Sequence, residues 1–168
     1  MIIRNADEND FDAVKEITKK TIKEIYPKYY PEGAVRYFLD HHSDEKITGD
    51  INKGTVYILE DDFGNDAGTV TISGNEIDRL FVLPEYQHLG YGRALLDLAE
   101  ERIAENFDTV TVHASLSAKK IYLERGYHEV EYHVTDTGYG DFLCYDVMEK
   151  KRDQLELLQY KEDIEWTV

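Results

Sequence analysis

The sequence predicts an α/β fold in which one mixed, mostly antiparallel sheet is flanked by helices, and three observations carry this prediction. Apolar residues recur with helical spacing in the first third of the chain. They alternate with the spacing of strands over residues 55–83. Helical and strand patterns then follow each other through residues 92–149, as expected for helices that flank a shared sheet.

The first third of the chain predicts a short strand over residues 2–4 and three helices. Side-chain oxygens of residues 7–10 can cap the first helix, and two prolines separate it from the second. Ser43 can cap the third helix, which is expected to end near Gly54. The apolar stripes that predict the first two helices are Phe11, Val14, Ile17, Ile22 and Ile25, and then Val35, Phe38, Leu39 and His42.

Six strands and two helices are predicted for the rest of the chain. The first three of these strands are joined by short turns and form an antiparallel meander. With the opening strand, the sheet has about seven strands. The six strands span residues 55–59, 67–73, 76–83, 109–114, 127–135 and 142–149, and the helices span residues 92–105 and 115–125.

A length of 168 residues and a mass of 19.5 kDa suit one domain. We expect residues 1–149 to form this domain and residues 150–168 to form a C-terminal extension. The extension contains Trp166 and several leucines, so it is expected to pack on the domain or at a dimer contact. One cysteine, no long apolar run and no signal peptide together predict a cytoplasmic protein without a membrane span.

The formal net charge is −16, from 19 basic and 35 acidic residues. This balance argues against nucleic acid as a partner, because phosphate contacts need a basic face. An acidic surface attracts cationic substrates such as amines, although solubility alone is a sufficient reason for the charge.

Residues 80–96 form the segment with the most chemical information: a strand, a loop with two glycines and an amphipathic helix. The first N–H groups of a helix have no partner within the helix and carry partial positive charge, so they bind anions. Gly90 and Gly92 let a phosphate approach the main chain closely. Taken alone, the two glycines fit a tight strand-to-helix turn equally well. The sequence patterns of nucleotide-triphosphate and dinucleotide sites are both absent.

Two motifs resemble sequence patterns of the GNAT superfamily of N-acetyltransferases. Gln87-His88-Leu89-Gly90-Tyr91-Gly92 resembles the family pattern Q/R-x-x-G-x-G/A. Residues 115–127 resemble the family pattern N-x-x-A-x-x-x-Y-x-x-x-G-F/Y, with Ser115 in place of the asparagine. The predicted element order fits the family over residues 1–149. The resemblance implies a GNAT fold, with a central sheet splayed in the middle, and acetyl-coenzyme A (acetyl-CoA) as the acyl donor.

The resemblance also implies where the donor binds. The N–H and C=O groups of Phe81 and Val82 would pair with the pantetheine arm. Ser115 would contact the pantetheine or cap the helix, as the asparagine does in this family. Similar enzymes use no metal. The residues whose main chain would bind the pyrophosphate are Gln87, His88, Leu89, Gly90, Tyr91 and Gly92, and Arg93 would open the helix that follows.

Tyr122 occupies the position that often acts as the general acid in this family, where it protonates the departing thiolate. A phenol is a suitable donor to a thiolate of similar basicity. Taken without the motif, Tyr122 is better explained as a packing tyrosine on the inner face of its helix. The residues that are expected to line the acceptor site are Tyr26, Tyr29, Tyr30, Tyr139 and Asp141.

A general base must take a proton from the attacking amine, directly or through water. Glu76 and Asp78 are candidates, because alternation along their strand places them on one face with Leu80 and Val82. Asp78 can instead be a surface charge that pairs with a neighbouring basic residue. The other candidate bases are His41, His42 and His113.

These observations predict an acetyl-CoA-dependent N-acetyltransferase in which a primary amine, expected to be a small molecule, attacks the donor directly. The alternative is a catalytically idle GNAT module that binds an acyl-CoA as a sensor or scaffold. A homodimer is compatible with both functions. The identity of the acceptor amine is not encoded in any pattern of the sequence.

Overall fold

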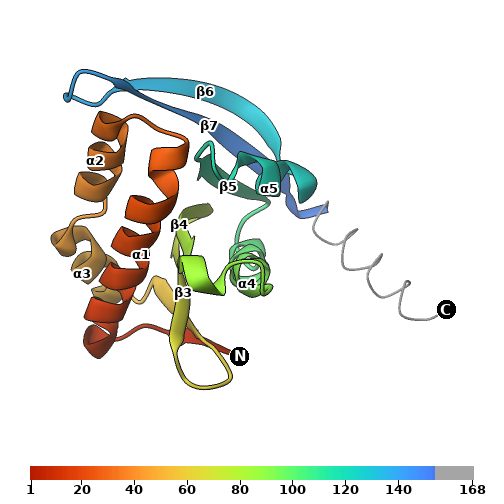
Figure 1. The fold of residues 1–168 in the computed structure, drawn as a ribbon. Helices are drawn as coiled ribbons and strands as arrows, with labels where there is room; N and C mark the ends of the chain where they lie inside the picture. The colour runs from red at the N-terminus through yellow and green to blue at the C-terminus, as the bar shows by residue number, and fades with distance from the viewer. Residues whose placement is uncertain (154–168) are drawn as a thin grey trace.

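Seven strands form one sheet in the order β1-β2-β3-β4-β5-β7-β6 in the computed structural model, which describes residues 1–153 (Figure 1). Neighbouring strands are antiparallel, except β4 and β5, which are parallel. The predicted mixed sheet is confirmed. The strands are β1 (Ile2–Asn5), β2 (Val56–Glu60), β3 (Asp66–Ser73), β4 (Glu76–Val82), β5 (Thr109–Ala114), β6 (His128–Asp136) and β7 (Phe142–Lys151).

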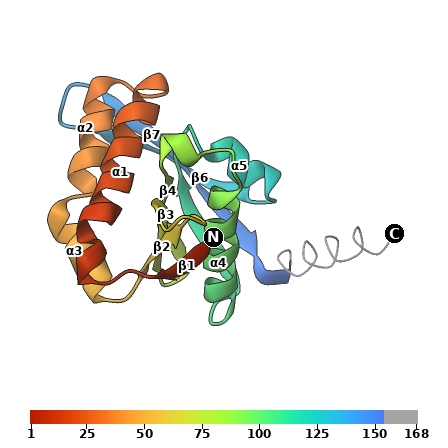
Figure 2. The same cartoon turned by 60° about the horizontal axis from the view of Figure 1, so that its bottom comes forward.

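Helices cover both faces of the sheet, as the two views in Figures 1 and 2 show. One group, α1 to α3, lies on one face, and α4 and α5 lie on the other. The helices are α1 (Phe11–Ile25), α2 (Glu32–His41), α3 (Asp44–Asn52), α4 (Tyr91–Ala104) and α5 (Lys119–Glu124), with short 3-10 turns η1 (Glu8–Asp10), η2 (Tyr26–Lys28) and η3 (Pro84–Tyr86).

The caps that the sequence predicted are present in two of these helical segments. The Asp7 side chain accepts a hydrogen bond from the Asn9 N–H and begins η1, and the Ser43 hydroxyl accepts one from the Lys46 N–H and begins α3. The predicted helix over residues 115–125 is shorter than expected. Residues 115–118 form a turn, in which the Ala118 N–H bonds to the Ser115 carbonyl, and α5 begins after it.

The sheet is splayed between β4 and β5. Their parallel pairing is limited to two positions, Glu76 with Thr111 and Ile77 with Val112. By contrast, β5 pairs with β7 along its whole length. Beyond Ile77 and Val112 the two parallel strands therefore separate, and the predicted splay in the middle of the sheet is confirmed.

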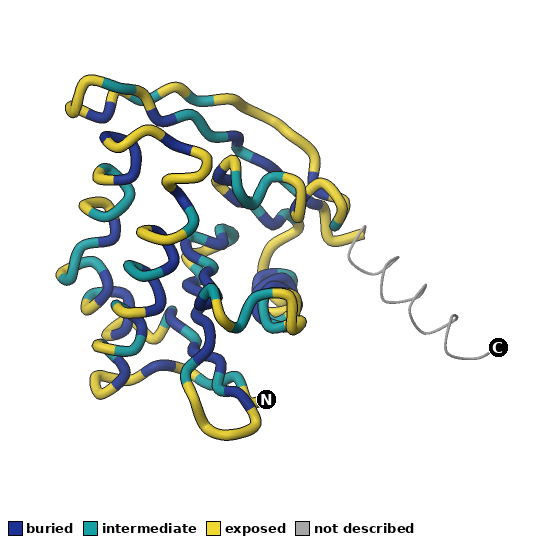
Figure 3. Tube along the Cα trace, in the orientation of Figure 1, coloured by how far each residue is buried: buried dark blue, intermediate teal, exposed yellow. Residues whose placement is uncertain are grey.

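Two hydrophobic clusters, one on each face of the sheet, hold the layers together (Figure 3). Ile17, Ile22 and Ile47 anchor the cluster under α1 and α3, and Leu95 and Ile103 anchor the cluster under α4. Each of these side chains is at most 1% exposed, and burying one stabilises the fold by about 1.5–3 kcal/mol. The two clusters thus fix helices to both faces of the sheet, and Tyr86 packs against both.

A β-bulge in β4 changes which side chains share a face. Thr71 is paired with Arg79 and Ile72 with Ile77, so Asp78 is the extra residue. The predicted alternation, with Asp78 on the same face as Leu80 and Val82, is wrong for this reason. Asp78 joins Arg79 on the face covered by α3, whereas Leu80 and Val82 pack in the cluster under α4.

The strand β7 extends to Lys151, past the predicted domain end at residue 149. Lys150 is 1% exposed and is part of the packed sheet. The predicted C-terminal extension therefore begins later than residue 150, and its residues 154–168 lie outside the described part of the chain. None of the helices within residues 1–153 has the length and apolar composition that are needed to cross a bilayer.

Candidate active site

One cavity of about 1180 Å³ opens at the splay of the sheet. Its lining comes from α1, α2, β4, the turn before α4, α4 itself, β5 and α5. Both faces of the sheet contribute, because the cavity occupies the separation between β4 and β5. The lining residues that are used below are Thr21, Tyr26, Phe38, His42, Asp78, Arg79, Phe81, Val82, Gln87, His88, Gly90, Gly92, Arg93, His113, Ser115, Ser117 and Tyr122.

The first wall of this cavity is formed by the main chain of residues 88–93, which we call the amide wall. None of its six N–H groups donates a hydrogen bond to an acceptor within residues 1–153. The first helical bond of α4 runs from the Ala94 N–H to the Gly90 carbonyl, and no side chain caps the helix. These N–H groups therefore remain available for an anion at the positive end of the helix.

Two residues of the amide wall have left-handed backbone conformations, Gly90 with φ 87° and His88 with φ 64°. A Cβ at Gly90 would have no neighbour within 4 Å, so the space in front of the turn is open. The side chain of Leu89 is exposed, and the Tyr91 ring packs on the Tyr86 ring at 6.1 Å. Neither Leu89 nor Tyr91 lines the cavity with its side chain, so their contribution to an anion site is limited to the main chain.

The register of β4 decides which main-chain groups face the gap. The Leu83 N–H bonds to Ala67 of β3, and antiparallel pairing turns alternate residues toward the same neighbour. The main-chain groups of Val82 therefore face the gap, whereas those of Phe81 face β3. The Val82 carbonyl accepts two side-chain hydrogen bonds, from Thr21 at 3.2 Å and Gln87 at 3.1 Å. A ligand in the gap is thus expected to contact the main chain at Val82. Phe81 lines the cavity with its ring instead.

Tyr122 lies in the cavity wall opposite the α1–α2 connection, and 9% of the residue is exposed. Its ring packs edge-on against Tyr127 at 5.3 Å, and its hydroxyl makes no hydrogen bond with the described residues. Burial raises the pKa of Tyr122 above its usual value, so the phenol stays protonated at neutral pH. Ser115 is buried nearby, and its hydroxyl is 2.9 Å from the Ser117 hydroxyl.

The opposite wall, which we call the ion-pair wall, consists of His42, Asp78 and Arg79 with their partners Lys46 and Asp50 from α3. The Asp78 carboxylate is 3.1 Å from the Lys46 ammonium, and the buried Arg79 guanidinium is 2.5 Å from Asp50. Burial acts to raise the pKa of Asp78, but the charge and hydrogen bond of Lys46 outweigh it and lower that pKa. Burial lowers the pKa of His42 to about 3, so this ring is neutral.

The remaining candidate bases lie at the edge of the splay or outside the cavity. His113 lines the cavity, and its Nδ1 is 3.6 Å from the carboxylate of Glu76. Glu76 itself does not line the cavity. His41 is exposed, and its Nε2 lies 3.5 Å from the Lys46 ammonium. His113 is therefore the candidate base with an open approach to the cavity.

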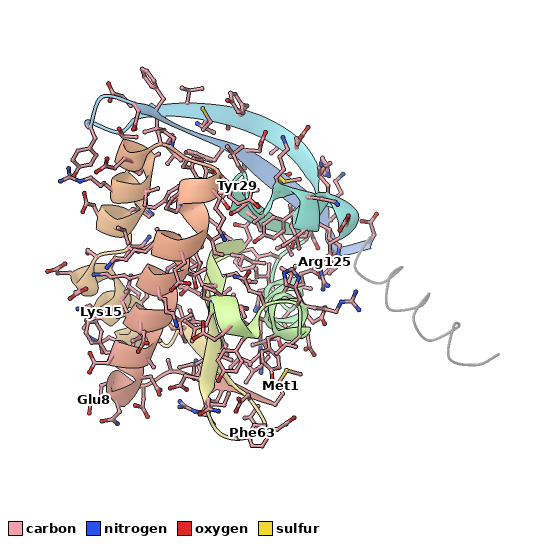
Figure 4. All side chains as sticks on the ribbon, in the orientation of Figure 1. Met1, Glu8, Lys15, Tyr29, Phe63 and Arg125 are labelled. Carbon is pink, nitrogen blue, oxygen red and sulfur yellow. The ribbon has the colours of Figure 1, made fainter. Side chains whose placement is uncertain are left out.

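The structure brings together some of the residues that were expected at the acceptor site and not others. Tyr26 lines the cavity, and burial raises its pKa to about 12. Tyr30 does not line it; its hydroxyl joins the Leu116 N–H to the Cys144 carbonyl. Tyr29 is half exposed in the connection between α1 and α2 (Figure 4).

Tyr139 and Asp141 do not line the cavity either, because they attach the β6–β7 hairpin to α2. The Tyr139 hydroxyl donates to Asp40 at 2.5 Å, and Asp141 accepts the Gly33 N–H at 2.8 Å. The sequence reasoning missed Thr21, Phe38 and Arg79, which line the cavity from α1, α2 and β4. These three residues lie within regular helix and strand patterns, so nothing in the neighbouring sequence indicated that they line a cavity.

A second buried charge network closes the far end of the cavity. Glu100 of α4 accepts hydrogen bonds from the Arg125 guanidinium at 2.9 Å, the Tyr127 hydroxyl at 3.0 Å and the Lys150 ammonium at 3.2 Å. Arg125, which Figure 4 labels, also contacts Asp97. These bonds connect α4, the end of α5 and β7, so they fix the helix that carries the amide wall.

Comparison with known proteins gives the family. A family model described as "Acetyltransferase (GNAT) domain" matches residues 25–149. No curated protein matches the sequence at a significant level. Among solved structures, a GCN5-related N-acetyltransferase from Rhodopseudomonas palustris is 24% identical, with a TM-score of 0.80 over 89% of this chain and 94% of its own.

Two further solved structures share the fold. PaiA N-acetyltransferase from Thermoplasma acidophilum, in complex with coenzyme A, is 22% identical, with a TM-score of 0.71 over 89% of this chain and 98% of its own. YncA from Salmonella typhimurium, solved with acetyl-CoA, is 14% identical, with a TM-score of 0.69 over 90% of this chain and 93% of its own. Because the family model matches most of the chain and the splayed sheet agrees with these structures, the chain belongs to the GNAT acetyltransferase family.

Proposed function

We propose that this protein is an acetyl-CoA-dependent N-acetyltransferase, and the amide wall is the observation that carries the proposal. Unpaired N–H groups at the start of a 14-residue helix form a binding site for an anion. A Cβ at Gly90 would meet no atom within 4 Å, so the main chain of this turn is open to a ligand. These are the features that binding of the coenzyme A pyrophosphate requires.

The gap between β4 and β5 is proposed to bind the pantetheine arm, which is the rest of the donor. Val82 presents its main-chain N–H to the gap, where it can donate a hydrogen bond to a carbonyl of the pantetheine arm, while the Val82 carbonyl is held by Thr21 and Gln87. The cavity volume of about 1180 Å³ is sufficient for a ligand of this size. PaiA and YncA were solved with coenzyme A and acetyl-CoA, which supports the same donor for this chain.

Acetyl-CoA supplies an acetyl thioester to the reaction, and the chain's own residues control the protons. We assign to Tyr122 the donation of a proton to the departing sulfur. Its hydroxyl has no competing partner among the described residues, and its raised pKa keeps the proton in place until a strong base develops nearby. Ser115 and Ser117 lie beside the same part of the cavity and can hold the pantetheine end by hydrogen bonds.

The acceptor is proposed to be a small primary amine that enters beside α1 and α2. On this side Tyr26 and Phe38 provide aromatic surface, with ring centroids 4.6 Å apart. The charged groups of the ion-pair wall are already paired with Lys46 and Asp50. An amine can therefore be held mainly by its apolar part, with its nitrogen directed to the splay.

Two matched glycine variants test the donor site. Gly90 and Gly64 both have positive φ, 87° and 81°, and a Cβ at either position would meet no atom within 4 Å, but Gly64 lies in the turn between β2 and β3. Valine at either position introduces the same kind of backbone strain. We expect Gly90→Val to weaken acetyl-CoA binding by at least about 100-fold, or about 2.7 kcal/mol, and Gly64→Val to leave it within about threefold.

Isothermal titration calorimetry of the three proteins measures this difference. Absence of acetyl-CoA binding by the unaltered protein at millimolar concentration would rule out the proposed function. Equal losses of affinity in both variants would place the donor elsewhere in the cavity.

A further inference from the structure

The splay has a defined vertex, and two side chains stand at it. The last paired residues of β4 and β5 are Ile77 and Val112. The next residue on β4 is Asp78, and the next on β5 is His113. Both line the cavity, so they are the first side chains that a group held between the separated strands meets.

Asp78 is poorly suited to take a proton at this vertex. Lys46 lies 3.1 Å from its carboxylate, and this ion pair favours the ionised form of Asp78. A carboxylate that is held ionised by a cation is a weak base. His42, which also lines the cavity, is buried and stays neutral, since its pKa is about 3.

His113 is placed differently. Val110, Val112 and Ala114 of β5 pack under α4, so alternation turns His113 to the side of α1 and α2, where the acceptor is proposed to enter. The side chain is 49% exposed, and its Nδ1 faces the Glu76 carboxylate at 3.6 Å. That approach favours a proton on Nδ1 and leaves Nε2 as the acceptor of the ring.

We propose that His113 is the general base for the acceptor amine and that Glu76 is the positioning residue that orients its ring. This assignment rests on the proposed acetyltransferase function, for which no general base had yet been assigned. Glu76, a candidate base in its own right by sequence, thus acts through His113 rather than on the substrate.

The resulting step balances without any further reactant. The amine nitrogen forms a bond to the acyl carbon while the carbon–sulfur bond breaks. The Nε2 atom of His113 takes the proton that leaves the nitrogen, directly or through one water. Tyr122 supplies a proton to the sulfur, and both residues return to their starting state when these protons exchange with solvent.

The charged and titratable groups on this side of the splay come from three elements. Glu76 and Asp78 lie on β4, His41 on α2 and Lys46 on α3. On β7, the Tyr145 ring lies at 5.5 Å from the His113 ring. Any pH dependence of the reaction must therefore be assigned by variants of His113 itself.

The chain contains a matched control on the far side of the same tyrosine. The ring of His133 also packs on Tyr145, at 5.0 Å, and its Nε2 is 3.2 Å from a carboxylate, that of Glu131. His133 does not line the cavity. His113→Gln and His133→Gln therefore remove similar surface contacts, and only the first removes the proposed base.

The test measures thiol release from acetyl-CoA by the full-length protein with spermidine, tyramine and butylamine as acceptors. For the acceptor with the fastest turnover, we expect His113→Gln to lower kcat at neutral pH about 100-fold. His133→Gln is expected to stay within about twofold, and calorimetry is expected to show unchanged acetyl-CoA affinity for both. The deficit should shrink at alkaline pH, because the amine then arrives already deprotonated.

Glu76→Gln and Glu76→Ala together distinguish a positioning role from a merely structural one. The amide oxygen of glutamine can still accept a hydrogen bond from Nδ1, so Glu76→Gln should retain most of kcat, whereas Glu76→Ala, which has no acceptor, should lower kcat with acetyl-CoA affinity unchanged. A structural role would lower kcat and acetyl-CoA affinity together in Glu76→Ala and would give no rescue by glutamine.

The possible outcomes separate the two proposals. If the unaltered protein releases thiol and His113→Gln retains its rate, or loses rate and acetyl-CoA affinity together, the assignment of His113 as the base is overturned while the acetyltransferase function stands. If the unaltered protein releases no thiol with any of the three amines and binds no acetyl-CoA, the function fails and the assignment fails with it. Binding without thiol release would also overturn the assignment, and would favour an acyl-CoA-binding module.

Discussion

The two walls of the cavity present polar groups in opposite ways. On the amide wall, the six N–H groups of residues 88–93 have no partner within the described chain. On the ion-pair wall, the charges of Asp78 and Arg79 are each paired with a residue of α3, and the buried atoms His42 Nδ1 and Arg79 Nη1 are left without a partner among the described residues. Free groups bind ligands and paired groups hold the fold, so the donor site is built from main chain, and the ion-pair wall serves mainly as structural support.

The contrast between the two walls depends most strongly on the ion-pair wall stabilising the fold. Arg79 is fully buried and joins β4 to α3 through Asp50. Arg79→Met leaves the Asp50 charge mostly buried with only the exposed Lys53 beside it, so we expect the free energy of unfolding to fall by about 3 kcal/mol. Urea denaturation measures this change.

Lys53→Met is the control for this prediction, because Lys53 contacts the same carboxylate from a side chain that is 70% exposed. Its loss is expected to cost at most about 1 kcal/mol. Equal effects of the two variants would mean that the Arg79–Asp50 pair contributes no more than a surface ion pair.

A second pair of variants sharpens the comparison at Tyr122, which lines the cavity and packs against the ring of Tyr127 behind it. The Tyr122 hydroxyl has no partner among the described residues, so Tyr122→Phe should lower kcat about 100-fold with little change in stability or in acetyl-CoA affinity. The Tyr127 hydroxyl donates to the buried Glu100, so Tyr127→Phe should lower stability by about 1–2 kcal/mol and keep kcat. If Tyr122→Phe lowered the urea midpoint and Tyr127→Phe lowered kcat, Tyr127 would be the proton donor and Tyr122 the structural residue.

The last prediction concerns the pH dependence of the ion-pair wall. Burial lowers the pKa of His42 to about 3 in the folded state, from an ordinary value near 6.5. The unfolded chain therefore takes up this proton first as the pH falls, so the stability contributed by the neutral ring is complete above pH 6.5 and declines below it. Between pH 7 and pH 5 the loss from His42 is about 2 kcal/mol.

His42→Leu removes the titrating group and should remove this part of the slope of unfolding free energy against pH. Urea titrations of both proteins between pH 7 and pH 5 compare the slopes. Parallel curves would show that His42 titrates alike in the folded and unfolded chains.

The two walls also differ in how well the sequence predicts them. The amide wall is local: Gln87, Gly90 and Gly92 lie within one turn, and the strand before it and the helix after it are both visible from apolar periodicity. The splay followed from the family resemblance and is confirmed by the two-residue pairing of β4 with β5.

The ion-pair wall was not predictable in the same way, because it depends on a bulge and on a distant helix. The extra residue at Asp78 leaves no mark in the alternation of β4, yet it turns that side chain to the face of α3. Its partner Lys46 is 32 residues away along the chain. Likewise, Tyr139 and Asp141 looked like loop residues near the site, but tertiary contacts with α2 decide their role.

Binding of a diphosphate by the main chain of residues 88–93 is tested most directly by NMR of the ¹⁵N-labelled full-length protein during titration with coenzyme A. The six amide signals of residues 88–93 are predicted to move downfield together and to saturate with the same dissociation constant that calorimetry gives, because each N–H gains a phosphate acceptor. Saturable binding that leaves these six signals in place would contradict the proposed donor site.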